Sequence, residues 1–97
     1  MGDGRVEHRM GASMAGRLET LEQSISERVL IQNVSGRGAR VITERMWQPH
    51  AHVALVDVVG GSRIGAEVVY CQRLSTNLCA VGLRFMDESS WGVLLRS

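Results

Sequence analysis

Hydrophobic residues from position 26 onward occur in short runs that are separated by polar and glycine-rich turns. The runs are rich in β-branched residues, which is typical of strands. Four strands are predicted on this basis: Arg28–Val34, Ala39–Glu44, His52–Val59 and Ile64–Arg73. A further strand is predicted near the end of the chain, because hydrophobic residues recur there with a period of two and therefore share one face. These residues are Val81, Leu83 and Phe85.

The segment Ser13–Glu22 fits two patterns. Leu18 and Leu21 have the spacing of one helical face, whereas Met14–Thr20 alternates as a strand does. The pattern alone leaves this choice open. Residues 1–12 combine glycine, charged residues and methionine without periodicity, so a flexible arm is predicted there.

The C-terminal residues are predicted to form a short helix. Asp87 is its predicted N-cap, and Trp91, Leu94 and Leu95 are spaced so that they share one face. That face is able to cover an opening of the sheet. Several short strands closed by one helix predict a small barrel or sandwich.

Length and charge narrow the function classes. The 97 residues suffice for one domain, which we place at residues 13–97 behind the arm. The chain shows no run of roughly 18 apolar residues and no apolar signal sequence, so we expect a cytoplasmic protein without membrane insertion. The net charge is +1, and all eleven basic residues are arginines. A near-neutral chain lacks a broad electrostatic footprint for DNA or RNA, whereas arginine forks suit phosphate capture at a few sites.

Residues typical of catalytic or metal sites are sparse. Cys71 and Cys79 lack zinc-site spacing and are expected to be reduced thiols. His50 and His52 have no evident carboxylate or thiol partner in the sequence pattern, so we expect surface histidines. No activated nucleophile is indicated, and we expect neither enzyme activity nor a metal or cofactor. The aromatic residues are expected to serve the core, its rim or helix packing: Trp47, Tyr70, Phe85 and Trp91.

A polar, glycine-rich turn separates the first two strands of the predicted series. Asn33 carries an amide that both donates and accepts hydrogen bonds, and Ser35 adds a hydroxyl. Gly36 and Gly38 permit positive φ angles and close approach by a ligand. Considered alone, these residues also describe an ordinary hairpin turn.

Two arginines precede this turn in the predicted arm. Arg5 and Arg9 are four residues apart, and each guanidinium is able to pair with a phosphate or stack on a flat ring. Arg37, inside the turn, is either a helper or a solvated bystander. An arm that becomes ordered only when a ligand arrives acts as a switch. Considered alone, the two arginines are equally typical of a solvated, charged tail.

Together, the RxxxR spacing of Arg5 and Arg9 and the NxSxxG pattern of Asn33, Ser35 and Gly38 resemble the signature of PilZ domains, the bacterial receptors for cyclic di-GMP. The resemblance covers most of the chain. It implies an all-β fold, a six-stranded antiparallel PilZ-like β-barrel with a short C-terminal helix, and it favours a strand over 13–22.

The resemblance also implies a function. It implies that cyclic di-GMP binds the five signature residues, with Gly36 and Arg37 as secondary candidates, and that the arm closes over the ligand. It further implies that the signal is relayed to an unidentified protein partner. Two departures from the family are evident: Asn33 stands where Asp is frequent, and Gly4 stands where many members have a further arginine.

Two alternatives remain beside this interpretation. The first is a degenerate PilZ-type module that binds a protein and no nucleotide. The second is a small barrel for single-stranded nucleic acid, which is disfavoured by the near-neutral charge and by the lack of a stacked aromatic platform.

Overall fold

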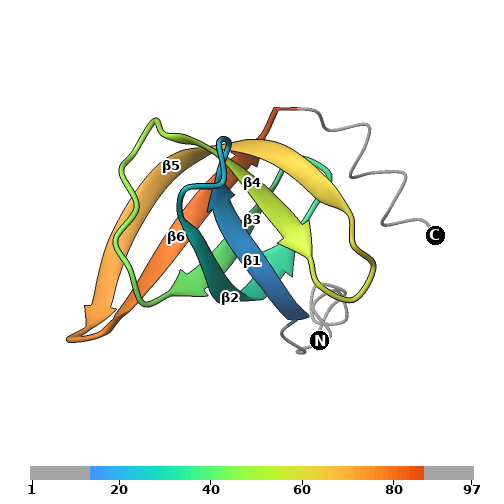
Figure 1. Ribbon diagram of the computed structural model, residues 1–97. Helices are drawn as coiled ribbons and strands as arrows, with labels where there is room; N and C mark the ends of the chain where they lie inside the picture. Colours follow the sequence, from blue (N-terminus) through green and yellow to red (C-terminus); the bar gives the residue numbers. More distant parts are fainter. Residues whose placement is uncertain (1–13, 87–97) are drawn as a thin grey trace.

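The computed structural model describes residues 14–86. Its elements are six strands: β1 (Met14–Thr20), β2 (Ser26–Val34), β3 (Gly38–Thr43), β4 (His52–Asp57), β5 (Arg63–Ser75) and β6 (Leu78–Phe85). All neighbouring strands are antiparallel and close into a barrel in the order β1-β2-β3-β6-β5-β4 (Figure 1). The predicted all-β class and the closed six-stranded antiparallel barrel are confirmed. The predicted C-terminal helix and the arm 1–12 lie outside the described residues.

The ambiguous segment before residue 26 is a strand, and it completes the barrel. Leu18 on β1 lies opposite Glu27 on β2 and opposite Leu55 on β4. Its side chain is fully buried, whereas Leu21 is 49% exposed in the turn that follows β1. The helical pairing of these two leucines is therefore wrong. Two hydrogen-bonded ladders favour the strand, which the local spacing did not reveal.

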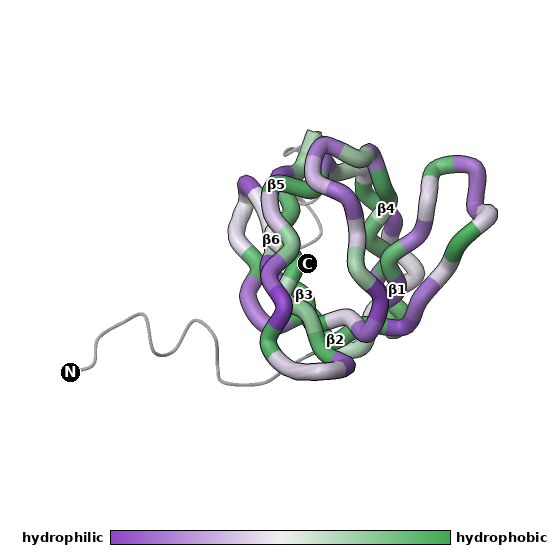
Figure 2. Tube along the Cα trace, turned by 90° about the vertical axis from the view of Figure 1, so that its left-hand side faces the viewer, coloured by the Kyte–Doolittle hydropathy of each residue, from purple (hydrophilic) through white to green (hydrophobic). Residues whose placement is uncertain are grey.

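The core fills the interior of the barrel with aliphatic and aromatic side chains from all six strands. Figure 2 shows hydrophobic and hydrophilic positions interspersed along the chain, and buried positions alternate with more exposed ones most clearly in β2 and the first half of β5. The buried cluster consists of Leu18, Val29, Ile31, Val41, Trp47, Val53, Leu55, Ile64, Ala66, Val68, Val81, Leu83 and Phe85. The one buried polar side chain of residues 14–86, Thr43, donates a hydrogen bond of 2.7 Å to the carbonyl of Arg45. Burial of this hydroxyl is thereby compensated.

Several predicted strand boundaries differ from the structure by one or two residues, and the end of β4 is one of them. The run His52–Val59 was expected to be a single strand, but β4 ends at Asp57. The Asp57 carboxylate accepts a hydrogen bond of 3.0 Å from the amide of Val59, and the Asp57 carbonyl accepts one from Gly61. These bonds form a turn, and they leave the Val59 side chain 88% exposed.

Tyr70 lies on the outer face of the barrel, which differs from the expected place in the interior or at the rim. A Cβ atom added at Gly82 would lie 2.2 Å from Cε2 of Tyr70, so the ring rests on the glycine. Leu83 and Phe85 point into the core as the alternation predicts, so Gly82 faces outward. It is nevertheless buried, because the Tyr70 ring covers it. A glycine covered by a cross-strand aromatic ring is a known means of protecting a sheet surface.

The segment that follows β3 is held against the barrel by Glu27. One carboxylate oxygen accepts hydrogen bonds from the backbone amides of Glu44 and Arg45 at 2.5 and 3.2 Å. The other accepts a bond of 2.9 Å from Nε1 of Trp47, whose ring is buried in the core as expected. The backbone amide of Trp47 also donates to Sγ of Cys71 at 3.4 Å. A single carboxylate thus satisfies three donors from a segment distant in the sequence.

We predict that Glu27→Gln lowers the free energy of unfolding by about 1–3 kcal/mol, because the amide turns an NH₂ group toward donors that need an acceptor. Glu44→Gln is the matched control, since its exposed side chain lies in the same segment, and we expect a change within about 0.5 kcal/mol. Denaturant unfolding followed by tryptophan fluorescence measures both. Equal stability of the two variants contradicts the role given to Glu27.

Candidate functional site

The glycine-rich turn between β2 and β3 is closed by Ser35. The backbone amide of Ser35 donates to the carbonyl of Gly38 at 2.9 Å. The Ser35 hydroxyl in turn accepts from the amides of Arg37 and Gly38 at 3.1 and 3.3 Å. The serine of the NxSxxG pattern therefore organises the turn itself, as a short hydroxyl side chain does in many turns.

Gly38 seats this turn directly on β6. It lies opposite Arg84, and a Cβ atom added at Gly38 would lie 2.1 Å from the carbonyl oxygen of Leu83. The amide of Phe85 donates to the carbonyl of Arg37 at 2.8 Å, which ties the turn to the end of the same strand. Gly38 is thus required by close approach of a neighbouring backbone.

The two turn glycines differ from the expectation of positive φ angles. Among the described residues, the one glycine with a positive φ is Gly61, at 76°. A Cβ atom at Gly36 would meet nothing within 4 Å. Gly36 is therefore replaceable, whereas Gly38 is not, although the sequence pattern presents them alike.

A polar row crosses the outer face of the sheet beside this turn. Asn33 on β2 lies opposite Arg40 on β3, Arg40 lies opposite Gly82 on β6, and Gly82 lies opposite Tyr70 on β5. The Asn33 side chain is exposed and makes no hydrogen bond with other residues of the described part of the chain. Arg40 is half-buried and donates from Nε to Gln32 at 3.1 Å. An amide, a guanidinium and an aromatic ring are thus neighbours on one surface.

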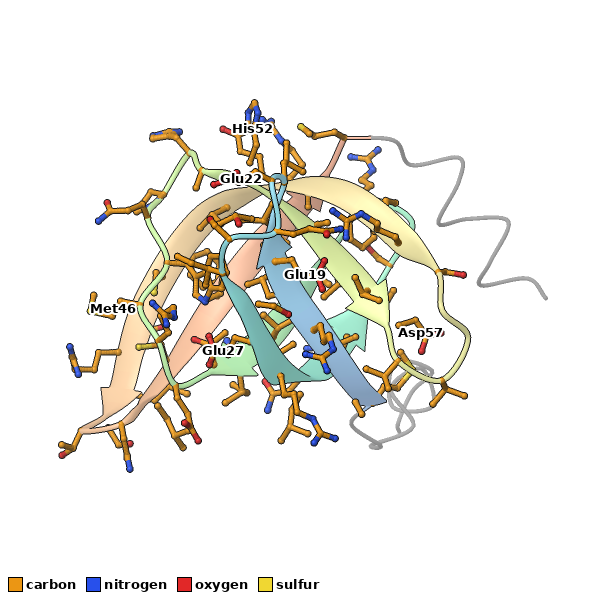
Figure 3. The ribbon with its side chains drawn as sticks, in the orientation of Figure 1. Glu19, Glu22, Glu27, Met46, His52 and Asp57 are labelled. Carbon is orange, nitrogen blue, oxygen red and sulfur yellow. The ribbon has the colours of Figure 1, made fainter. Side chains whose placement is uncertain are left out.

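Positive charge gathers around the turn. Arg37 in the turn, Arg40 on β3 and Arg84 on β6 come from adjacent segments, and neither β3 nor β6 contains an acidic residue. Other carboxylates, labelled in Figure 3, lie elsewhere on the barrel: Glu19 on β1, Glu27 on β2 and Asp57 on β4. The arrangement favours an anion at the turn.

One acidic residue lies close to this surface. Glu67 on β5 is opposite Arg84 and forms an ion pair with it through Oε1 and Nη2. Its other oxygen lies 3.4 Å from Nδ1 of His50. The hydrogen bond from the Arg84 guanidinium lowers the pKa of the Glu67 carboxyl below its ordinary value, and the hydrogen bond with His50 lowers it further to a smaller extent.

The predicted arginines of the arm, Arg5 and Arg9, lie outside the described residues. The structure does describe the start of β1, which follows them in the sequence. Met14, the first residue of β1, is opposite Ile31 on β2, two positions before Asn33. Because β1 and β2 are antiparallel, the start of β1 lies at the end of β2 that leads into the glycine turn.

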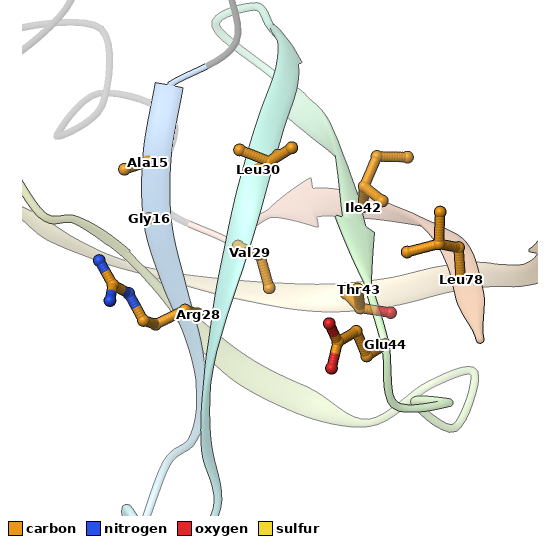
Figure 4. A pocket seen from close by; sticks show the side chains of 9 residues that line it. All are labelled: Ala15, Gly16, Arg28, Val29, Leu30, Ile42, Thr43, Glu44 and Leu78. Atoms are coloured by element: carbon orange, nitrogen blue, oxygen red, sulfur yellow. The ribbon is translucent and has the colours of Figure 1, made fainter.

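A separate hollow of about 320 Å³ lies on the wall formed by β1, β2, β3 and β6 (Figure 4). Its lining residues are Ala15, Gly16, Arg28, Val29, Leu30, Ile42, Thr43, Glu44 and Leu78. It includes none of the predicted site residues. The signal in the sequence was the unbroken run Val29-Leu30-Ile31, since a strand with one face in water needs only alternate hydrophobic positions. Leu30 is accordingly 50% exposed.

The two cysteines lie on the neighbouring strands β5 and β6. Cys71 is half-buried and Cys79 is buried, and both are free thiols. Burial raises the pKa of the Cys79 thiol and so disfavours its thiolate, and the neighbouring Cys71 thiol adds a smaller increase. No group of three or more His, Cys, Asp or Glu side chains in this range is arranged to hold a metal ion.

Comparison with known protein families found no family model that matches the chain, and comparison with curated proteins found no relative. Within residues 14–86, no helix has the length and apolar character needed to cross a membrane.

We predict that Gly38→Ala lowers the free energy of unfolding by at least about 2 kcal/mol, because the new methyl group collides with the Leu83 carbonyl. Gly36→Ala should leave stability within about 0.5 kcal/mol of the wild type, since open space surrounds that position. Thermal or denaturant unfolding of both variants tests the difference. Similar losses at the two positions contradict the seating of the turn on β6.

Proposed function

We propose that this chain is a PilZ-type receptor that binds cyclic di-GMP at the β2–β3 turn, in a bacterial cytoplasm. The observation that carries the proposal is the common location of the turn and the start of β1. The second half of the signature lies where β2 leads into the turn, and the first half precedes β1, whose start lies at that same end of β2. An arm that leaves from Met14 begins beside the strand that presents Asn33.

The chemistry of the surface suits a planar, doubly anionic nucleotide. The exposed Asn33 amide offers a donor and an acceptor to a guanine edge. Arg37 is exposed and has no ion-pair partner among the described residues, so it is available to a phosphate. Tyr70, 40% exposed above Gly82, offers part of a ring face to a flat base.

The length of the arm is sufficient for the proposed closure. Arg9 lies five residues before Met14, and a fully extended chain of that length spans about 17 Å. Arg5 lies four residues further away and gains about 14 Å of reach. Both guanidinium groups are thus within reach of a ligand on the turn. Closure of the arm changes the surface that an unidentified protein partner contacts, which is how the signal is passed on.

A second candidate function is a PilZ-type interaction module that binds a protein and no nucleotide. The observation that favours it is the apolar hollow around Leu30 and Ile42, which is separate from the turn. The structural roles of Ser35 and Gly38 also account for two of the three defined positions of the NxSxxG pattern without any ligand.

Titration calorimetry with cyclic di-GMP distinguishes the two functions. We expect the wild type to bind in the micromolar range or tighter, and Asn33→Ala and Arg9→Ala to bind about tenfold or more weakly through loss of ligand hydrogen bonds. Asn33 is a sharper probe than Ser35 or Gly38, because its side chain is not used by the turn.

Arg28→Ala is the matched control. Arg28 lies on the same strand as Asn33, is exposed, and lines the hollow instead of the turn. We expect it to bind as the wild type does. No heat from the wild type at ligand concentrations well above micromolar rejects the receptor function and leaves the protein-interaction module.

A further inference from the structure

The ion pair between Glu67 and Arg84 adjoins the proposed ligand site. Arg84 is opposite Gly38 on one side and opposite Glu67 on the other, so it stands between the turn and this carboxylate. The backbone next to Arg84 contacts the turn, because the amide of Phe85 donates to the carbonyl of Arg37. The Arg84 side chain is 64% exposed and the Glu67 side chain 20%.

We propose that Glu67 is an internal competitor of the ligand and that Arg84 is a ligand-binding residue. In the free protein the Glu67 carboxylate occupies the Arg84 guanidinium. A phosphate bound at the turn takes over this guanidinium, and Glu67 keeps its contact with His50 and with water. This inference rests on the proposed function. It implies that the ion pair between β5 and β6 tunes the affinity for cyclic di-GMP.

The contacts around the turn single out Arg84. Arg40 donates to the neutral Gln32, and Arg37 has no acidic partner among residues 14–86. Of the three arginines, Arg84 alone is paired with a carboxylate in the described part of the chain. This ion pair must break before Arg84 binds a phosphate. The preference of Glu67 for its ionised form, seen in its lowered pKa, is consistent with a full negative charge facing Arg84 near neutral pH.

The exchange is feasible because the pair is on the surface. Exposed ion pairs contribute little net free energy, so releasing Arg84 requires only a modest part of the binding energy. A phosphate offers a guanidinium two parallel hydrogen bonds, whereas the pair with Glu67 uses Nη2 alone. The second oxygen of Glu67 already lies near Nδ1 of His50, so the carboxylate retains a partner after the exchange.

Calorimetric titration of Glu67→Gln with cyclic di-GMP tests the proposal. We expect binding about two- to fivefold tighter than the wild type, because Arg84 no longer has to leave a charged partner. Arg84→Ala should bind more weakly than the wild type. The double variant Glu67→Gln/Arg84→Ala should match Arg84→Ala, since the effect of Glu67 acts through Arg84.

Glu19→Gln is the matched control, because Glu19 forms a similar exposed pair with Arg63 on another part of the wall. It should bind as the wild type does. If the wild type binds and Glu67→Gln binds no tighter, the competitor role is overturned and the receptor function stands. A gain that persists in the double variant also overturns it. If neither the wild type nor Glu67→Gln binds, the proposed function fails and the competitor role fails with it.

Discussion

The close approach of Gly38 to the Leu83 carbonyl is the contact on which the rest of this surface depends. Because position 38 has no side chain, β3 begins directly beside β6, and the Arg37 carbonyl reaches the amide of Phe85. This seating fixes the register of the β3–β6 ladder. In that register Val41 points into the core while Arg40 lies in the outer polar row. A packing constraint in the backbone thus determines where the charges of the candidate site stand.

The residues of the NxSxxG segment fall into two groups with different structural roles. Ser35 and Gly38 build the turn and attach it to the barrel, and their chemistry is largely satisfied within the protein. Asn33 and Arg37 are exposed, with side chains that make no hydrogen bond or ion pair in the described range. A rigid frame with unpaired polar groups at its edge is a suitable starting point for ligand recognition, because little has to be reorganised on binding.

The strands β2 to β6 were predictable because each is a hydrophobic run bounded by turn residues. The pattern left β1 ambiguous, and the resemblance to PilZ domains supplied both this strand and the closed barrel. The side-chain contacts between distant segments were not predicted, because they depend on which strands become neighbours. Glu27 meets Trp47 across 20 residues, and Glu67 meets Arg84 across 17. Tyr70 was expected in the interior or at the rim of the barrel, yet the missing side chain of Gly82 gives its ring a place on the outer face. Such pairings follow from register, which local periodicity leaves undetermined.

In the proposed receptor, the arm and the β2–β3 turn hold cyclic di-GMP between them at one end of the barrel. The most direct test of this arrangement is a nitrogen-15 nuclear magnetic resonance titration with cyclic di-GMP that follows backbone amides and arginine Nε groups together. Binding at the turn predicts saturable shifts at Asn33–Gly38, accompanied by shifts of the Nε signals of Arg5 and Arg9. Shifts confined to the region around Trp47 and Cys71, or no shifts at saturating nucleotide, contradict it.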